Sequence, residues 1–389
     1  MSKIHQTLSD LAKTPGLPGF VAMASHRGKP VFSGAYGQRG PALVEPMASD
    51  QVFYIASMTK IVTTVAAQQL VEQGKIGMDQ DLGTLIPDLA APKVLEGFDD
   101  KGVAILRPAK GPITLRQLLT HTSGFGYDMW NPDLAQYVAA SSTPGIGTGL
   151  KAALKLPLAF DPGTAWEYGI GIDWAGLVIE AVSGKALDVY FHDHITTPLG
   201  MVDTAFLPHS AMQPRLAGMA ARGPDGGLMA FTLPINPSPE FWSGGGGLYS
   251  TASDYLRFLQ MILDGGKTAN GTQILTPASL GLLAQNHMGE TPLRRLGTMM
   301  PFLTHDLDVG AALGLDAPAW GLGLAVNPKT GPNGRSAGSL AWAGLANTYY
   351  WIDPERQVAG VFMSQLLPFA DPKVLEAFAA FERGVYEAL

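Results

Sequence analysis

The sequence predicts an α+β fold in which the two ends of the chain build one antiparallel sheet and the middle forms a mostly helical lobe. Three observations lead to this prediction. Segments typical of strands lie near both termini. Patterns typical of helices dominate between about residues 80 and 240. A closing helix follows the last strand, so helices are expected to flank the sheet.

Two strands are predicted near the N-terminus, at residues 19–26 and 30–36, on either side of Arg27-Gly28. Three more are predicted near the C-terminus, and the last two are joined by the turn Asp353-Pro354-Glu355-Arg356. These three strands are residues 339–345, 348–352 and 358–363.

The closing helix has Asp371 as its predicted N-cap and Pro372 at its first position. Its apolar stripe repeats at helical spacing and consists of Val374, Leu375, Phe378, Phe381, Val385 and Tyr386.

In the middle of the chain, residues 114–120 and 172–182 have helical patterns, and irregular Gly- and Pro-rich loops separate them. We expect a discontinuous α/β domain of residues 1–80 and 241–389, with residues 81–240 inserted as the mostly helical lobe. Ligand clefts favour domain interfaces, so the active site is expected at the seam.

The composition indicates a globular protein with a substantial core. Of 389 residues, 46% are hydrophobic and only 15% are charged. Glycine (47) and proline (29) are abundant, as in enzymes that build sites from shaped loops. The net charge is −7 and no Lys/Arg cluster is present, so the sequence does not indicate a basic surface for nucleic-acid binding.

The chain has no cysteine, which excludes disulfides, thiolate metal sites and a cysteine nucleophile. No apolar run follows the charge in the first six residues, so no signal peptide is predicted. We therefore expect a cytoplasmic protein, or one whose leader has been removed. No apolar stretch approaches the roughly 20 residues that span a bilayer, so no membrane partner is expected. The oligomeric state stays open.

Ser57 and Lys60 are the most informative pair of residues. They stand three positions apart at the start of a predicted helix that ends before Gly74, so they share one face. A hydroxyl is thereby held near an amine that can take its proton, at the positive end of a helix dipole. The apolar residues that define this helix are Ile61, Val62, Val65, Ala66 and Leu70.

Further signals follow Ser57-Met58-Thr59-Lys60 in order along the chain. They are Leu118-Leu119-Thr120-His121-Thr122-Ser123-Gly124, Trp166-Glu167-Tyr168-Gly169-Ile170, Gly244-Gly245-Gly246-Gly247-Leu248-Tyr249-Ser250-Thr251, Trp320-Gly321-Leu322-Gly323 and Trp342-Ala343-Gly344. The pattern resembles the serine β-lactamase/penicillin-binding-protein superfamily, and within it the family VIII carboxylesterases, whose sequences look like class C β-lactamases. The resemblance extends from about residue 19 to the C-terminus and implies a β-lactamase/transpeptidase-like fold.

The resemblance also implies roles for individual residues. Ser57 would be the nucleophile that forms an acyl-enzyme, and Lys60 its proton partner. Tyr168 stands where the family has the tyrosine of Tyr-x-Asn, a general base and then acid. Trp342-Ala343-Gly344 takes the place of Lys-Thr-Gly, so its strand would flank the acyl group. The backbone N–H groups of Ser57 and Leu345 would form the oxyanion hole.

Lysine and tyrosine both titrate near pH 10 when unperturbed, so only about one in a thousand is basic at neutral pH. One of the two side chains must therefore have a pKa shifted toward neutrality if it is to act as a base. A nearby ammonium would lower the tyrosine pKa, and burial would lower the lysine pKa. Coupled groups titrate together, so which of Lys60 and Tyr168 is the base stays open. Activity is expected to rise on the alkaline side of neutrality.

Two departures from the β-lactamase pattern bear on the substrate. Trp342 replaces a lysine that attracts the antibiotic carboxylate, and Ile170 replaces the asparagine that bonds the lactam amide. Both exchanges favour an uncharged, small-molecule acyl ester. Aromatic residues near the motifs are candidates for the pocket wall or for the core: Phe125, Tyr127, Trp130, Trp166, Phe241 and Trp242.

A competing motif, Gly334-Arg335-Ser336-Ala337-Gly338, matches the G-x-S-x-G nucleophile elbow. No histidine follows it, since the last is His305, so we interpret it as a turn before a strand. His121 is expected to tie down its loop by hydrogen bonding. His192 and His194 point apart on a helix, and no metal site is predicted.

The leading hypothesis is a serine carboxylesterase for short acyl esters that needs no cofactor. The alternatives are a β-lactamase or D-alanyl-D-alanine peptidase, an acyltransferase to an alcohol or amine, and a catalytically silent binding protein on the same scaffold. Hydrolysis and transfer share the acyl-enzyme and differ only in what attacks it.

Overall fold

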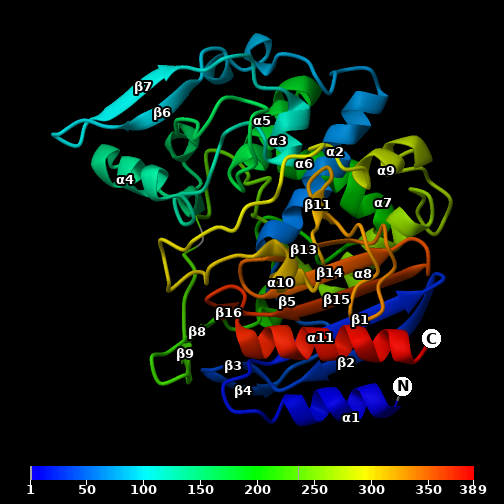
Figure 1. Cartoon of the computed structure of the whole chain (residues 1–389). Helices are drawn as coiled ribbons and strands as arrows, with labels where there is room; N and C mark the ends of the chain where they lie inside the picture. The colour runs from blue at the N-terminus through cyan, green and yellow to red at the C-terminus, as the bar shows by residue number, and fades with distance from the viewer. Residues whose placement is uncertain (1, 235) are drawn as a thin grey trace.

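The computed structural model of the protein describes residues 2–234 and 236–389. Its centre is a seven-stranded sheet that is antiparallel throughout (Figure 1). In spatial order the strands are β11 (Ala319–Trp320), β12 (Ala325–Val326), β13 (Leu340–Gly344), β14 (Thr348–Asp353), β15 (Val358–Ser364), β1 (Phe20–His26) and β2 (Lys29–Tyr36).

The two ends of the chain meet in this sheet, as predicted. β1 pairs with β15 over its whole length, from Phe20 opposite Ser364 to His26 opposite Val358. All five strands predicted near the termini are present. The short strand β11 at the edge of the sheet and its neighbour β12 were not predicted.

Helices cover both faces of the sheet. In β14, successive side chains contact helices on opposite faces. Tyr349 stacks on Phe378 of α11 with ring centroids 4.7 Å apart, whereas Tyr350 contacts Tyr255 of α8 on the opposite face. Successive side chains of a strand point to opposite faces, so β14 is buried on both sides. The helices, in chain order, are α1 (Ser2–Leu11), α2 (Thr59–Glu72), α3 (Leu115–Thr120), α4 (Pro132–Ser141), α5 (Gly171–Ser183), α6 (Leu187–Phe191), α7 (Thr197–Leu199), α8 (Ala252–Leu263), α9 (Pro277–Leu283), α10 (Val309–Leu313) and α11 (Pro372–Glu387).

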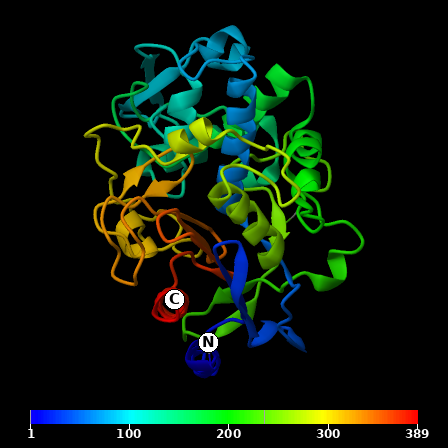
Figure 2. The same ribbon diagram turned by 90° about the vertical axis from the view of Figure 1, so that its right-hand side faces the viewer.

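The two terminal helices lie beside each other, and Figure 2 views both of them end-on. The Asp371 side chain caps α11 by accepting from the N–H groups of Lys373 and Val374, which confirms the predicted cap. Helix α1 was not predicted. It buries Ile4 and Leu8 against α11.

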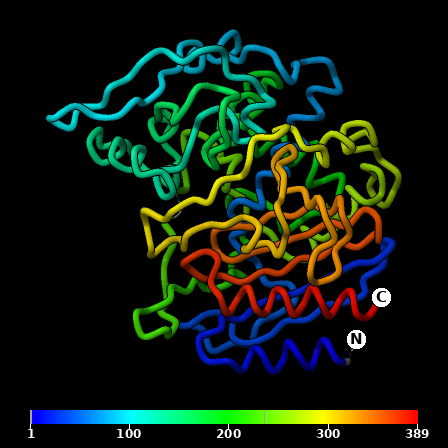
Figure 3. The backbone as a smooth tube through the Cα atoms, in the orientation of Figure 1, coloured from blue at the N-terminus to red at the C-terminus, as the bar shows by residue number. Residues whose placement is uncertain are grey.

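The middle of the chain lies above the sheet in Figure 3, and its predicted helices are present as α3 and α5. It also contains a projecting hairpin, β6 (Lys93–Phe98) and β7 (Ala104–Pro108), that the sequence patterns did not reveal. Near its end the chain returns to the sheet-bearing part, where β8 (Ala220–Arg222) pairs with β16 (Leu366–Leu367). The division at residues 81–240 stays a prediction.

The remaining strands are short pairs at the edges of these two parts. They are β3 (Gln38–Gly40) with β4 (Leu43–Pro46), β9 (Leu228–Ala230) with β8, and β5 (Val52–Tyr54) with β10 (Tyr249–Thr251). The β5–β10 pair leads directly into the segment that carries Ser57.

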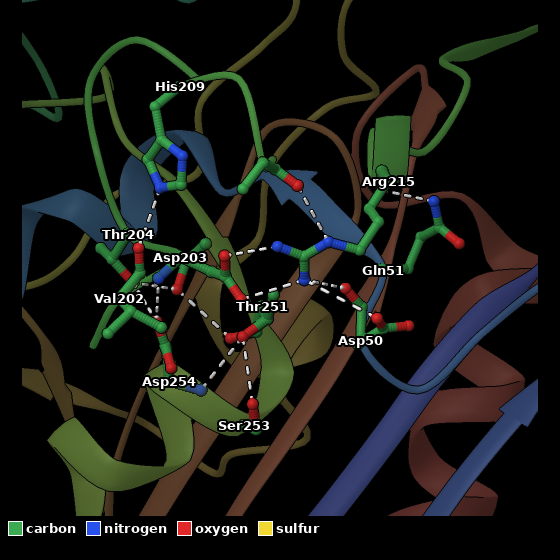
Figure 4. A network of polar contacts seen from close by, with 12 residues as sticks. Asp50, Gln51, Val202, Asp203, Thr204, His209, Arg215, Thr251, Ser253 and Asp254 are labelled. Atoms are coloured by element: carbon green, nitrogen blue, oxygen red, sulfur yellow. Dashed lines mark hydrogen bonds and ion pairs between the residues drawn. The ribbon is translucent and has the colours of Figure 1, made fainter. Parts of the chain in front are cut away.

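A polar network holds the β5–β10 pair in place (Figure 4). Arg215 donates to the Asp203 carboxylate, with 3.0 Å from Nη1 to Oδ2, and to the carbonyl oxygen of Asp50 over 3.1 Å. The N–H of Asp203 donates to Asp254 Oδ2 over 2.7 Å, and Thr251 Oγ1 accepts from the N–H of Asp254. This network joins the segment before β5, the end of β10 and the first turn of α8.

Candidate active site

Ser57 and Lys60 lie where a short 3₁₀ turn, η1 (Ala56–Met58), runs into α2. Lys60 Nζ donates a hydrogen bond to Ser57 Oγ over 3.1 Å, so the predicted pair is formed. Ala56 has a φ of 43°, in the left-handed region that residues other than glycine rarely adopt. Strained backbone of this kind clusters at functional sites, and here it directly precedes the predicted nucleophile.

The Lys60 side chain is completely buried, and its amine has three partners. Besides Ser57 Oγ, Nζ donates to Tyr127 Oη over 3.2 Å and to the carbonyl oxygen of Gly245 over 2.6 Å. It also lies 4.7 Å from the centre of the Tyr168 ring. An ammonium has three N–H donors, so each of them has an acceptor here.

Burial lowers the pKa of Lys60 to about 7, and the negative charge of Asp173 opposes this shift. Removing an ammonium from water penalises the charged form, which is why the amine releases its proton more easily. Near neutral pH a large fraction of Lys60 is therefore neutral. A base with a pKa near the working pH is well suited to proton transfer.

Tyr168 lies buried beside this pair. Burial raises its pKa well above the usual value, while hydrogen bonds with Ser57 and Trp342 oppose the rise. The expectation that a nearby ammonium lowers the tyrosine pKa is wrong, because desolvation of the phenolate outweighs the favourable contacts. The tyrosine thus keeps its proton at the pH at which Lys60 loses one.

Trp342, Ala343 and Gly344 form the end of β13, next to the turn that carries Ser57. A Cβ atom on Gly344 would lie 2.2 Å from the carbonyl oxygen of Ile55, so the strand approaches the turn this closely only because residue 344 is glycine. Within the described ranges, the N–H groups of Ser57 and Leu345 donate to no protein acceptor. The predicted oxyanion hole requires such free donors.

A cavity of about 190 Å³ opens above Ser57. Ser57, Tyr127, Tyr168 and all four residues from Trp342 to Leu345 lie in its wall, whereas Lys60 lies behind it. No Asp, Glu, Lys, Arg or His is found among the described residues of the lining. The rest of the wall is mostly apolar and aromatic and includes Met129, Trp130, Phe206, Leu233, Phe241, Trp242, Tyr249, Leu307 and Phe369.

Phe125 and Ile170 do not reach this cavity, contrary to their predicted role in substrate binding. Phe125 is buried against Trp174, with ring centroids 5.8 Å apart, and lines a separate pocket. Ile170 is also buried and lines a small cavity that it shares with Tyr127. Tyr127 lines both the cavity above Ser57 and this small cavity, whereas Ile170 lines only the small one. Trp166, another aromatic candidate, is not in the wall either.

Two residues near Lys60 were missed by the sequence analysis, Asp173 and Ser243. Both are linked to Lys60 through Gly245, whose carbonyl oxygen accepts from the amine. Asp173 Oδ1 accepts hydrogen bonds from Ser243 Oγ over 2.6 Å and from the N–H of Gly245 over 3.0 Å. The sequence could have pointed to Asp173, because a carboxylate inside the apolar pattern of residues 172–182 is expected to be buried, and buried acids are rare without a partner.

His121 ties down its loop, as predicted. Its carbonyl oxygen accepts from the N–H of Glu167 over 2.9 Å, and its Nδ1 accepts from the N–H of Gly169 over 3.3 Å. The ring packs on Tyr168, with centroids 4.6 Å apart, and burial lowers the pKa of His121 well below its usual value. The neighbours of Tyr168 on both sides are therefore held by this one histidine.

The G-x-S-x-G motif is a turn before β13, as predicted. The N–H of Ser336 donates to Asp353 Oδ2 over 2.9 Å, and Arg335 forms a buried ion pair with Glu382 of α11. These contacts give the motif a structural role. Within the described part of the chain, no three His, Cys, Asp or Glu residues are placed to hold a metal ion, and no helix is long and apolar enough to cross a membrane.

Comparisons with known proteins identify the family of this chain. The family model described as Beta-lactamase matches residues 4–384. The chain is 32% identical to monacolin J acid methylbutanoyltransferase of Aspergillus terreus, covering 96% of this chain and 92% of that protein. It is 31% identical to lovastatin esterase of Penicillium rubens, covering 99% and 98%.

Solved structures give the same result. Unliganded simvastatin synthase (LovD) from Aspergillus terreus superimposes with a TM-score of 0.85 at 29% identity, over 100% of this chain and 98% of that one. EstCE1, described as a hydrolase with promiscuous acyltransferase activity, shares the fold with a TM-score of 0.78 at 22% identity, over 99% and 98%. The chain therefore belongs to the beta-lactamase family, as a serine hydrolase or acyltransferase of β-lactamase/transpeptidase-like fold.

Proposed function

We propose that this protein is a serine carboxylesterase that hydrolyses short-chain acyl esters through an acyl-enzyme on Ser57. The observation that carries the proposal is the buried Lys60 amine, with a pKa of about 7, hydrogen-bonded to Ser57 Oγ beside a cavity whose described wall has no charged side chain. A tuned amine beside a hydroxyl is the arrangement that activates a serine nucleophile.

In the first half-reaction, Lys60 accepts the proton of Ser57 as Oγ attacks the ester carbonyl carbon. The N–H groups of Ser57 and Leu345 stabilise the negative oxygen that develops. The carbon–oxygen bond of the ester then breaks, and Tyr168 donates its proton to the departing alkoxide. The Lys60 ammonium returns a proton to Tyr168. In the second half-reaction, water attacks the acyl carbon by the same steps and releases the acid and Ser57.

The apolar wall supports an uncharged substrate. Lactam antibiotics carry a carboxylate, and burying it against Trp342 and the other apolar lining residues would leave a charge without a partner. We therefore favour a neutral ester over a lactam. The 31% identity to a protein named lovastatin esterase also supports ester hydrolysis.

Acyl transfer is the second candidate function, and the relative named monacolin J acid methylbutanoyltransferase favours it. Transfer needs the same acyl-enzyme, attacked by an alcohol or an amine instead of water. Adding a series of alcohols to the esterase assay separates the two: a transferase forms a new ester and raises the rate of phenol release, whereas a strict hydrolase forms only the acid.

The primary test is turnover of p-nitrophenyl acetate and butyrate. We expect the wild type to release p-nitrophenol, and Ser57→Ala to lose on the order of 10⁴-fold or more in kcat. Ser336→Ala is the matched control, because it removes the other motif serine outside the cavity, and it should stay active. Activity that survives Ser57→Ala, or an inactive Ser336→Ala enzyme that is folded, would overturn the proposal.

A further inference from the structure

A buried carboxylate lies next to the proposed catalytic amine. Asp173 is the third residue of α5 and its side chain is completely buried. Its Oδ1 accepts hydrogen bonds from Ser243 Oγ over 2.6 Å and from the N–H of Gly245 over 3.0 Å. Its Oδ2 has no partner among the described residues. An acid buried in this way without a direct cationic partner calls for a physical reason, because its desolvation is costly.

The hydrogen bonds of Asp173 lead to Lys60 through a single residue. Gly245 donates its N–H to Asp173, and its carbonyl oxygen accepts from Lys60 Nζ over 2.6 Å. The carboxylate therefore holds the turn that faces the amine. Any change in the position of Asp173 moves the carbonyl group on which Lys60 is anchored.

The turn is built to let the carboxylate approach. A Cβ atom on Gly245 would lie 2.4 Å from Asp173 Oδ2, which no real structure tolerates. At the neighbouring Gly246, the nearest atoms to such a Cβ would be 3.8 Å away, an ordinary contact. Residue 245 must therefore be glycine for the carboxylate to stay in place, whereas the space at 246 would admit a methyl group.

We propose that Asp173 is a positioning residue of this active site, which holds the Ser243–Gly245 turn against Lys60 and supplies the negative charge that the amine faces. The inference rests on the proposed function, because it concerns the protonation of the amine that serves Ser57. Asp173 does not touch the substrate, since it is absent from the cavity wall.

The groups that sense this charge come from several elements. They are Lys60 of α2, Tyr54 of β5, and Tyr127 and Tyr168 from the loops above the sheet. Burial is the largest cause of the pKa shift of each group; the negative charge of Asp173 adds to the rise for the three tyrosines and opposes the fall for Lys60. Lys60 is the one cation among them. Burial raises the pKa of Asp173, and the charge of Lys60 and the hydrogen bonds from Ser243 and Gly245 oppose this rise. Removing the negative charge should therefore lower the pKa of Lys60.

The test is the pH dependence of kcat/KM for p-nitrophenyl butyrate between pH 5 and 9 with Asp173→Asn. The amide keeps an oxygen that can accept from Ser243 and Gly245; it removes the negative charge and puts an NH2 group in place of Oδ2, which has no partner in the described part of the chain. Lys60 must be neutral to act as base, so a lower pKa moves the acidic limb to lower pH, by about one unit. A merely structural residue would reduce kcat and leave this limb in place, which would overturn the proposal.

Asp254 provides a matched control. It is also a buried carboxylate at the third position of a helix. It accepts from the N–H of Asp203 and pairs with Arg257, and Lys60 is not among the charges that shift its pKa. Asp254→Asn should lower the melting temperature without moving the acidic limb. An equal displacement of the limb in both variants would show that the effect is not specific to Asp173, and it would contradict the inference.

Gly245→Ala gives a second test that leaves Asp173 intact. The methyl group would push the carboxylate away from Lys60 and thereby lower the pKa of the amine. The acidic limb of the pH profile of Gly245→Ala should therefore also move to lower pH, and an unmoved limb in the folded variant would count against the inference. The proposed function and the role of Asp173 can be overturned separately. An active Ser57→Ala enzyme overturns the proposed function, whereas an inactive one combined with an unmoved limb in Asp173→Asn overturns only the role of Asp173.

Discussion

Trp342 donates a hydrogen bond from its indole Nε1 to the phenolic oxygen of Tyr168 over 3.1 Å, and the two rings are in contact with centroids 5.0 Å apart. The residues are 174 positions apart and come from β13 and the segment before α5. The sequence placed Trp342 on the strand that would flank the acyl group and gave it no polar contact. The structure adds a polar contact, in which a neutral donor holds the phenol without bringing a charge into the cavity.

The first prediction concerns this bond. Trp342→Phe keeps an aromatic ring but removes the N–H, so the Tyr168 oxygen loses a donor that stabilises its negative form. We expect kcat for p-nitrophenyl butyrate to fall about tenfold, which corresponds to a hydrogen bond of about 1.4 kcal/mol, with a small change in KM. If KM rose and kcat stayed constant, Trp342 would act only in substrate binding.

The second prediction concerns pH. Burial lowers the pKa of Lys60 to about 7, so the neutral amine increases as the pH rises through 7. We expect kcat/KM to rise between pH 6 and 8 and then to level off. Lys60→Arg should be inactive across this range, because a guanidinium does not deprotonate in proteins. A flat profile between pH 6 and 9 would exclude Lys60 as the base.

The third prediction concerns His121, whose φ of 57° is left-handed and whose Nδ1 accepts from the N–H of Gly169. Asparagine tolerates this backbone, and its Oδ1 can replace Nδ1 as acceptor. We expect His121→Asn to retain most of the activity. His121→Leu should lose about 1–3 kcal/mol of unfolding free energy in urea, because the buried N–H of Gly169 is left unpaired. Equal stability of the two variants would contradict this role.

The fourth prediction concerns the close approach of β13 to the Ser57 turn. Gly344→Ala would place a methyl group 2.2 Å from the Ile55 carbonyl oxygen, so the strand must move away and the predicted oxyanion donors must separate. We expect kcat to fall by about 100-fold, in the range found for loss of an oxyanion donor. Gly281→Ala is the control, since no atom lies within 4 Å of a Cβ at that position in α9, and it should be neutral or stabilising.

The prediction from sequence was most successful where the signal is local. The Ser57–Lys60 pair lies within one helical turn, so its spacing determines that the two side chains share a face. The cap Asp371 and the terminal strands were also readable from neighbouring residues. Helix α1 and the β6–β7 hairpin were missed because their patterns are short and partly exposed.

The sequence by itself determined the fold class, the pairing of the chain's two ends in one sheet and the presence of Ser57, Lys60 and Tyr168 in a recognisable order. Only the tertiary structure decided which groups surround the amine. It brought Tyr127, Gly245 and Asp173 to Lys60 and left Phe125 and Ile170 outside the cavity. It also decided that burial raises the pKa of Tyr168 and lowers that of Lys60, because desolvation depends on everything packed around a group and not on its neighbours along the chain.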